Sequence, residues 1–198
     1  MINSIRKQVL LLMVLSFLAT PLYAAPKLNG FAEQTRQWAV QCRNEVAEQF
    51  DLLITSGQLK EAQLFDTFYI PIPNTYPQKF QTQYDVIADG VVRPIIDKYQ
   101  AKSKKVLAVY IIDVNGYAPT HNSRYSKPLT GFPYVDIKIS RTKRIFNDKP
   151  GLRAARNLDA YLLQEFHTDA GNRVMNDLSV PITVKGRHWG AVRVIFKK

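Results

Sequence analysis

The sequence of 198 residues predicts an α+β domain in which a long N-terminal helix packs on an antiparallel β-sheet of about five strands. Three observations support this prediction. Apolar residues recur at three-to-four spacing across residues 29–57, which is the pattern of an amphipathic helix. Residues 106–113 are rich in valine and isoleucine, as central strands are. Three strand-like runs separated by turn sequences begin at residue 161.

Residues 1–24 have the order of a secretory signal peptide. A basic start at Arg6-Lys7 precedes an apolar run at residues 9–19, and Ala24 ends a small-residue cleavage site. The apolar run is shorter than the roughly 20 residues that span a bilayer. We therefore expect cleavage after Ala24, a periplasmic location and a single domain over residues 25–198. An uncleaved N-terminal anchor is the alternative.

The long helix is expected over residues 29–57, with Asn29 as its N-cap and the Ser56-Gly57 pair at its end. Cys42 is the only cysteine and falls on the apolar face, so we interpret it as a core residue. A lone cysteine excludes an internal disulfide and a covalently attached haem. The apolar face of this helix would permit a homodimer, or the sheet would cover it entirely.

Three further segments precede the first strand. A short helix is expected at residues 60–65. Two prolines make residues 68–74 an extended surface segment rather than a central strand. Helical spacing returns over residues 84–99, where Pro94 predicts a kink or the start of a new helix.

The first strand, residues 106–113, is followed by Asn115-Gly116, a pair typical of tight hairpins because both residues tolerate positive φ. Residues 117–121 would then form the returning strand. The chain beyond it is polar and basic and interrupted by prolines and glycines as far as Gly151, which favours a functional or disordered loop. A short helical turn is expected at residues 151–157.

Three strands are expected to close the protein, at residues 161–168, 173–184 and 188–196, with turns at 170–172 and 185–187. His188 and Trp189 would point to opposite faces of the last strand, with Trp189 in the core. The predicted order is therefore two helical regions followed by an antiparallel meander.

Three stretches of the sequence carry a family resemblance. They are residues 113–122 (DVNGYAPTHN), 143–157 (KRIFND leading to GLRAARN) and 177–190 (DLSVPI leading to GRHWG). Together they closely resemble the Cache-type sensory domain of bacterial methyl-accepting chemotaxis proteins. The resemblance implies a PAS-like fold that binds a small ligand and passes on a conformational change. Because the sequence holds no methylated coiled coil, we expect a stand-alone domain that acts through a membrane receptor or signalling partner.

Candidate ligand-binding residues come from two kinds of position. His121 and Asn122 end the predicted return strand, where side chains can face a ligand cleft; a hydrogen-bonded surface histidine is the alternative for His121. Arginines bracket the end of the basic stretch, and their forks suit carboxylate or phosphate, although a solvated surface would give the same pattern. Aromatic residues nearby would line a pocket or pack the loop. The candidate ligand-binding set is Tyr117, His121, Asn122, Arg141, Arg144, Arg156 and His188.

The composition limits the classes of partner that the protein is expected to bind. A formal net charge of +11 at pH 7 favours anionic partners. Nucleic acid is not expected, because the basic residues are dispersed and carry no RNA-binding or zinc-finger signature. Three histidines far apart in the sequence do not predict a metal site, and no hydrolase or metalloprotease signature occurs, so no enzyme is expected. No cofactor is predicted, while a non-covalent haem is left open.

Two functional hypotheses remain. The leading one is a periplasmic domain that senses a small, anionic metabolite and is linked to chemotaxis-type signal transduction. The alternative is an interaction protein whose basic loop docks on an anionic membrane or an acidic partner. Salt distinguishes the two, because an exposed electrostatic contact weakens steeply with ionic strength while a partly buried ligand contact is screened much less.

Overall fold

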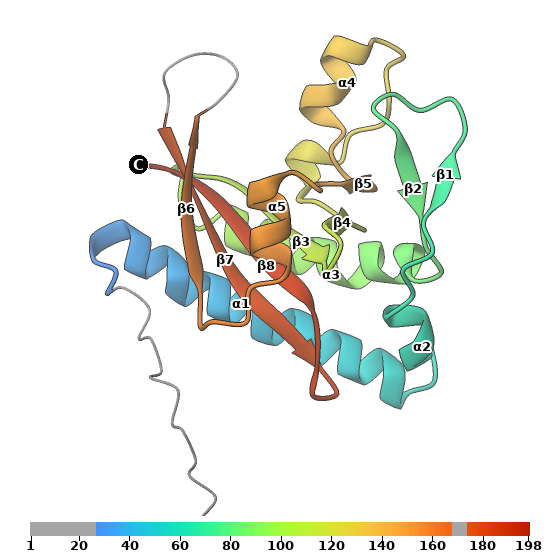
Figure 1. Cartoon of the computed structure of the whole chain (residues 1–198), viewed down its shortest axis with the longest axis horizontal. Helices are drawn as coiled ribbons and strands as arrows, with labels where there is room; N and C mark the ends of the chain where they lie inside the picture. Colours follow the sequence, from blue (N-terminus) through green and yellow to red (C-terminus); the bar gives the residue numbers. More distant parts are fainter. Residues whose placement is uncertain (1–26, 168–173) are drawn as a thin grey trace, which may run out of the picture.

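The computed structural model describes residues 27–167 and 174–198, and the leader predicted at residues 1–24 lies outside these ranges. In chain order the elements are α1 (Gly30–Thr55), α2 (Glu61–Leu64), β1 (Ile70–Ile72), β2 (Lys79–Gln81), α3 (Asp85–Gln100), β3 (Val106–Asp113), β4 (Tyr117–Ala118), the 3₁₀ helix η1 (Ser123–Tyr125), α4 (Pro133–Ile139), β5 (Arg144–Ile145), α5 (Lys149–Ala155), β6 (Leu162–His167), β7 (Val174–Val184) and β8 (Arg187–Lys197). Figure 1 shows α1 behind the largest sheet and α5 in front of it. The predicted α+β class, an N-terminal helix on antiparallel strands, is confirmed.

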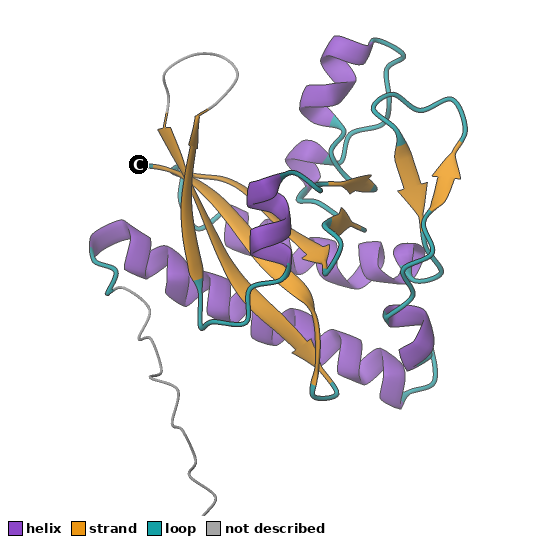
Figure 2. Cartoon of the chain, in the orientation of Figure 1, coloured by secondary structure: helices purple, strands orange, loops and turns teal. Residues whose placement is uncertain are grey.

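The largest sheet holds four strands in the order β3-β8-β7-β6, and every neighbouring pair is antiparallel. The other strands form two separate two-stranded sheets, β1-β2 and β4-β5, which Figure 2 shows beside the main sheet. The expected five-stranded sheet is therefore four-stranded, because the predicted returning strand pairs elsewhere. The turn predicted between the last two strands is confirmed, with positive φ values of 50° at Lys185 and 76° at Gly186.

Helix α1 packs on β7 and β8 through one apolar face. That face includes Cys42, Val46 and Phe50, all fully buried, so the interpretation of Cys42 as a core residue is confirmed. The outward positions of α1 are polar except for the exposed Leu52, and the face that the sequence offered for a homodimer is used by the sheet and α3 within one chain. Asn29 occupies the N-cap position, but its side chain makes no capping hydrogen bond, contrary to the sequence prediction.

The inner layer also contains Trp189 and residues of α3. Trp189 is buried, packs 5.3 Å from Phe50 between ring centroids, and donates its Nε1–H to the carbonyl of Leu64 at 3.0 Å, which confirms it as a core residue. Helix α3 continues through Pro94 as one element, so no new helix starts there. In the described part of the chain, no helix combines the length and the apolar character needed to cross a bilayer.

The turn after β3 differs from the predicted tight hairpin. Only Gly116 has a positive φ, of 81°, and its N–H donates to the carbonyl of Asp113 at 2.9 Å. The Asp113 carboxylate accepts hydrogen bonds from the N–H groups of Asn115 and Tyr117, which holds the turn as an Asx-type turn. The chain then pairs with β5 through β4. Farther on it is joined to β3 by a bridge between Tyr110 and His121 and by a hydrogen bond from the Asn122 N–H to the carbonyl of Val109 at 3.2 Å.

The stretch expected to be an irregular loop contains regular structure. Helices α4 and α5 and strand β5 all lie between His121 and Arg156. Asp148 is the N-cap of α5 and accepts a hydrogen bond from the Gly151 N–H at 2.7 Å, with Pro150 in the first turn. The helical turn predicted at residues 151–157 is therefore present but begins at Lys149.

The main sheet has two unlike faces because alternate side chains of each strand point to opposite sides. The inner face carries large apolar side chains and packs against α1 and α3. The outer face carries small residues, among them Ala108 and Ala191, and is covered by Ala154 and Ala155 of α5. Small residues on this face leave room beside them for larger polar side chains, which form the site described next.

Candidate functional site

A polar cluster lies on the outer face of the main sheet. Tyr110 of β3 pairs across the sheet with Arg193 of β8, and Arg193 in turn pairs with Ser179 of β7. The chain that follows β4 adds side chains from above. The complete set, called the outer-face cluster below, is Tyr110, His121, Asn122, Tyr125, Arg141, Asp177, Ser179 and Arg193.

An ion pair anchors the cluster. The Arg193 guanidinium binds the Asp177 carboxylate through two hydrogen bonds, one of them from Nε to Oδ1 at 3.2 Å, and both side chains are buried. Burial lowers the pKa of Arg193, but Tyr110 and Asp177 raise it more, so the guanidinium keeps its charge. The paired geometry also fixes Arg193 over the Tyr110 ring, with Cζ 5.3 Å from the ring centroid.

Cations and rings alternate through the cluster. The rings of Tyr110 and His121 are stacked at 4.4 Å with an interplanar angle of 10°. Tyr125 meets His121 edge-on at 5.1 Å, and the Arg141 guanidinium lies 5.1 Å from the Tyr125 ring centroid. Arg193 therefore stands at one end of an aromatic stack and Arg141 at the other. Such rings offer flat apolar contacts, and the cations beside them attract negative charge.

Four buried polar atoms of the cluster have no hydrogen-bond partner among the described residues. They are His121 Nδ1, Asn122 Nδ2, Arg141 Nε and Ser179 Oγ. A buried polar atom left unpaired costs about 1–3 kcal/mol, and native proteins contain few of them. Within the part of the chain described, Arg141 also makes no ion pair. Unpaired polar atoms on several residues of one cluster mark a candidate position for a bound polar molecule.

Burial of His121 makes the free energy of unfolding depend on pH. Burial, with Arg141 nearby, lowers the pKa of His121 from 6.5 to about 3. The unfolded chain takes up a proton below pH 6.5 while the folded protein does not, so stability falls as the pH drops from 6.5 toward 3. Between pH 7 and pH 5 we expect the wild type to lose about 2 kcal/mol more unfolding free energy than His121→Phe, which cannot titrate. Urea unfolding at both pH values measures this, and equal losses would contradict it.

The structure brings together only part of the predicted set. His121, Asn122 and Arg141 meet in the outer-face cluster. His121 is buried rather than at the surface, because Tyr110 and Tyr125 enclose its ring. Arg144 lies over the Phe146 ring at 5.4 Å. The pKa of Arg144 is lowered mainly by burial and further by the nearby charge of Arg141. Arg144 therefore lies at the border of the cluster.

The other predicted residues lie apart from the cluster. The buried Tyr117 hydroxyl is 2.8 Å from Asp85 Oδ2, in the inner core, and its contacts are those of a structural residue. His188 Nε2 lies 2.9 Å from the carbonyl oxygen of Ala155, at the end of α5. Arg156 Nε donates to the carbonyl of Val114 at 3.2 Å. In the described ranges, no three side chains of the metal-ligating types gather in one place.

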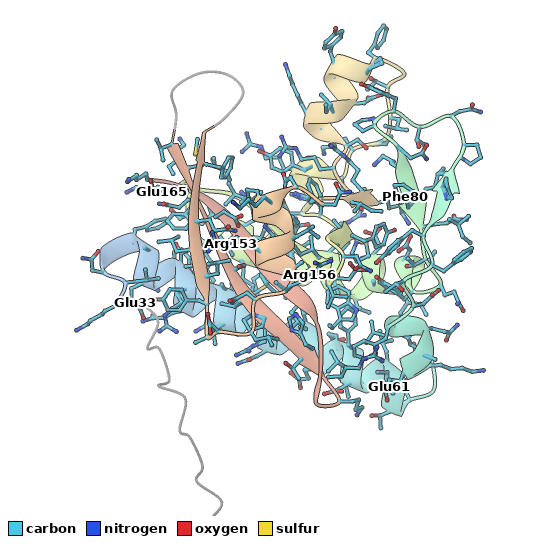
Figure 3. All side chains as sticks on the ribbon, viewed as in Figure 1. Glu33, Glu61, Phe80, Arg153, Arg156 and Glu165 are labelled. Atoms are coloured by element: carbon cyan, nitrogen blue, oxygen red, sulfur yellow. The ribbon has the colours of Figure 1, made fainter. Side chains whose placement is uncertain are left out.

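A separate open depression lies along α5. It has a volume of about 670 Å³ and is lined by Asn147, Lys149, Leu152, Arg153 and Arg156. Figure 3 labels Arg153 of α5 and Arg156, the C-cap residue of that helix, and both are exposed. Because the lining holds three cations and no acid, the depression adds to the positive field over this side of the molecule.

Sequence reasoning missed Tyr110, Asp177, Ser179 and Arg193. The signal that could have found them is alternation. Asp177 and Ser179 interrupt an apolar run at every second position, and Arg193 stands between Val192 and Val194. Polar residues that share one face of a buried strand have to meet partners there.

Comparison with known proteins found no matching family model and no matching curated protein. Among solved structures, the chain is similar to an extracellular ligand binding receptor from Desulfohalobium retbaense, with 14% identity and a TM-score of 0.40, over 83% of this chain and 25% of that chain. It is also similar to the ligand-binding domain of Campylobacter jejuni chemoreceptor Tlp3 in complex with 4-methylisoleucine, with 13% identity and a TM-score of 0.38, over 85% and 61% of the two chains. The chain thus spans less than two thirds of either protein. With TM-scores this low, neither likeness carries an argument about function.

Proposed function

We propose that the protein is a sensory domain that binds a small organic anion in the outer-face cluster. The observation that carries the proposal is the group of buried, unpaired polar atoms around the aromatic stack. The proposed role needs binding alone, without a chemical step. A Cache-type identity and a place outside the cytoplasm are part of the proposal, supported by the motifs at residues 113–122 and 177–190 and by the leader-like residues 1–24.

The charges of the cluster favour an anion. Asp177 neutralises Arg193 in the ion pair, whereas Arg141 has no acidic partner among the described residues and has a buried, unpaired Nε. A carboxylate placed beside Arg141 would accept the hydrogen bonds of its planar fork. The rings of Tyr110, His121 and Tyr125 would contact the apolar part of the same ligand.

Ligand binding at this position would couple two layers of the fold. Tyr110 and Arg193 belong to the rigid sheet, while His121, Tyr125 and Arg141 belong to the chain that covers it. A ligand that contacts both layers stabilises one arrangement of the cover over another by its differential affinity. We propose that a membrane receptor or other signalling partner detects this change, as in chemotaxis-type signal transduction.

Arg141→Gln tests the proposal. Thermal-shift screening and calorimetric titration with a panel of di- and tricarboxylic acids and amino acids should find a ligand of the wild type. Loss of a hydrogen bond to a charged group costs about 1.5–3 kcal/mol, so Arg141→Gln should weaken that ligand roughly 10- to 100-fold.

Arg187→Gln is the matched control, because Arg187 also lies over an aromatic ring, that of Phe65 at 4.2 Å, but at the far end of β8. Its affinity should equal that of the wild type. A ligand that binds both variants as tightly as the wild type would place the site elsewhere, and the absence of any ligand in the panel would remove support for an organic-anion sensor.

A further inference from the structure

Exposed apolar side chains gather on a projecting part of the fold. The segment of residues 127–140, called the α4 protrusion below, carries α4 and extends away from the main sheet at the top of Figure 1. Phe132 is 69% exposed and Tyr134 is 87% exposed. Leu129, Val135 and Ile137 are exposed as well. Single exposed apolar residues are ordinary in proteins, but five within nine consecutive residues form a patch that needs an explanation.

The protrusion is held together by its own hydrogen bonds. At its base, the Lys127 N–H donates to the carbonyl of Ile139 at 3.1 Å, and the Ser140 hydroxyl donates to the carbonyl of Lys127 at 2.6 Å. Near its tip, the Asp136 carboxylate accepts from the N–H groups of Thr130 and Gly131. These bonds hold the backbone of the protrusion, on which the apolar side chains are exposed.

Exposed cations lie close in the sequence to these apolar side chains. Lys127 and Lys138 are exposed within the protrusion, and Arg124 is exposed three residues before it. Asp136 is the only acidic residue between positions 124 and 144, and it is buried with its oxygens occupied by local donors. The protrusion and the residues just before it therefore present exposed aromatic and aliphatic side chains together with exposed cations. Segments that lie in the interface of anionic membranes have this composition.

We infer that the α4 protrusion docks the protein on a bilayer surface that contains anionic lipids. Phe132 and Tyr134 would enter the interfacial region, and Lys127 and Lys138 would lie at the headgroups. The apolar side chains of Tyr134, Val135 and Ile137 leave the helix in different directions, at roughly 100° per residue. A fluid lipid phase can surround such a convex tip on several sides. The proposed docking surface uses none of the side chains of the outer-face cluster and goes beyond ligand sensing.

Vesicle flotation with the full chain tests the inference. The wild type should float with mixed phosphatidylcholine–phosphatidylglycerol vesicles and less with pure phosphatidylcholine vesicles. Phe132→Ser/Tyr134→Ser should reduce the affinity for the mixed vesicles by about tenfold or more, because two large apolar side chains no longer enter the interface. Since both residues are exposed, the melting temperature should stay that of the wild type, which excludes misfolding as the cause.

The matched control is Val86→Ser/Leu158→Ser, which removes apolar side chains of similar exposure, 84% and 75%, from other elements. It should bind vesicles as the wild type does. Two results would overturn the inference. One is binding that both double variants retain equally, which would assign it to the general positive charge. The other is no binding of the wild type to either vesicle, which would leave the protrusion to a protein partner.

Discussion

Replacing Arg193 by methionine is expected to lower the free energy of unfolding by about 3–5 kcal/mol. The reason is the buried carboxylate that remains. Asp177 is almost fully buried, and its ion-pair partner is Arg193. Without the guanidinium, Asp177 keeps an uncompensated charge in a medium of low polarity. Urea unfolding followed by circular dichroism measures the loss.

The double variant Asp177→Leu/Arg193→Met separates the charge effect from lost packing. Removing both partners of a buried ion pair is often nearly neutral, so the double variant should regain most of the stability that Arg193→Met loses. Arg187→Met, at the exposed end of the same strand, should change the free energy of unfolding by less than about 0.5 kcal/mol. If Arg193→Met were as stable as the wild type, another group would have to compensate the buried charge of Asp177.

Gly190→Ala is expected to destabilise the protein by about 3 kcal/mol, because an added methyl group would strike the backbone of the neighbouring strand. A Cβ at Gly190 would lie 2.0 Å from the carbonyl oxygen of Ile112 and 2.6 Å from the Cα of Asp113. These atoms belong to the β3–β8 ladder and cannot move without breaking its pairing. Thermal and urea unfolding measure the effect.

Gly90→Ala provides the control for that substitution. Gly90 lies in α3, and a Cβ there would meet no atom within 4 Å. The same chemical change should therefore stabilise the protein by up to about 1 kcal/mol, because alanine favours a helix over glycine. Equal effects of the two substitutions would contradict the close strand approach described for Gly190.

The sequence predicted the helices and strands that are buried on one face or on both, because such burial gives a regular pattern of apolar residues. The apolar spacing over residues 29–57 located α1, and the unbroken valine and isoleucine run located β3 at its exact bounds. Strands β7 and β8 were also close to their predicted ranges, because the turn between them contains Gly186, which has the positive φ that glycine readily adopts. In these elements, local pattern and tertiary packing favour the same structure.

The predictions failed where a single side chain determines the backbone conformation through its hydrogen bonds. The Asn115-Gly116 pair resembles a tight hairpin, but the Asp113 carboxylate binds the following N–H groups and opens the turn. The stretch around α4 looked like a loop because its order depends on Asp136, which binds residues on the N-terminal side of its own helix. Neither contact follows from periodicity.

Three of the eight residues of the candidate site, His121, Asn122 and Arg141, were predicted from the sequence. The order of the chain places His121 and Asn122 together, and Arg141 could be proposed from its charge. The cluster residues on the sheet could not be predicted, because Tyr110, Ser179 and Arg193 become neighbours only through the β3-β8-β7 register. That register joins residues far apart in the sequence.

The most direct test of the ligand-binding proposal is the ¹⁵N resonance of the His121 ring, assigned by its loss in His121→Gln. The measurement is a titration of labelled protein with the organic acid that binds most tightly in the panel. If the outer-face cluster is the site, His121 Nδ1 gains a partner or a new environment, and its resonance shifts until the ligand is saturating. A ligand that saturates the protein while the His121 resonances stay in place would contradict the proposal.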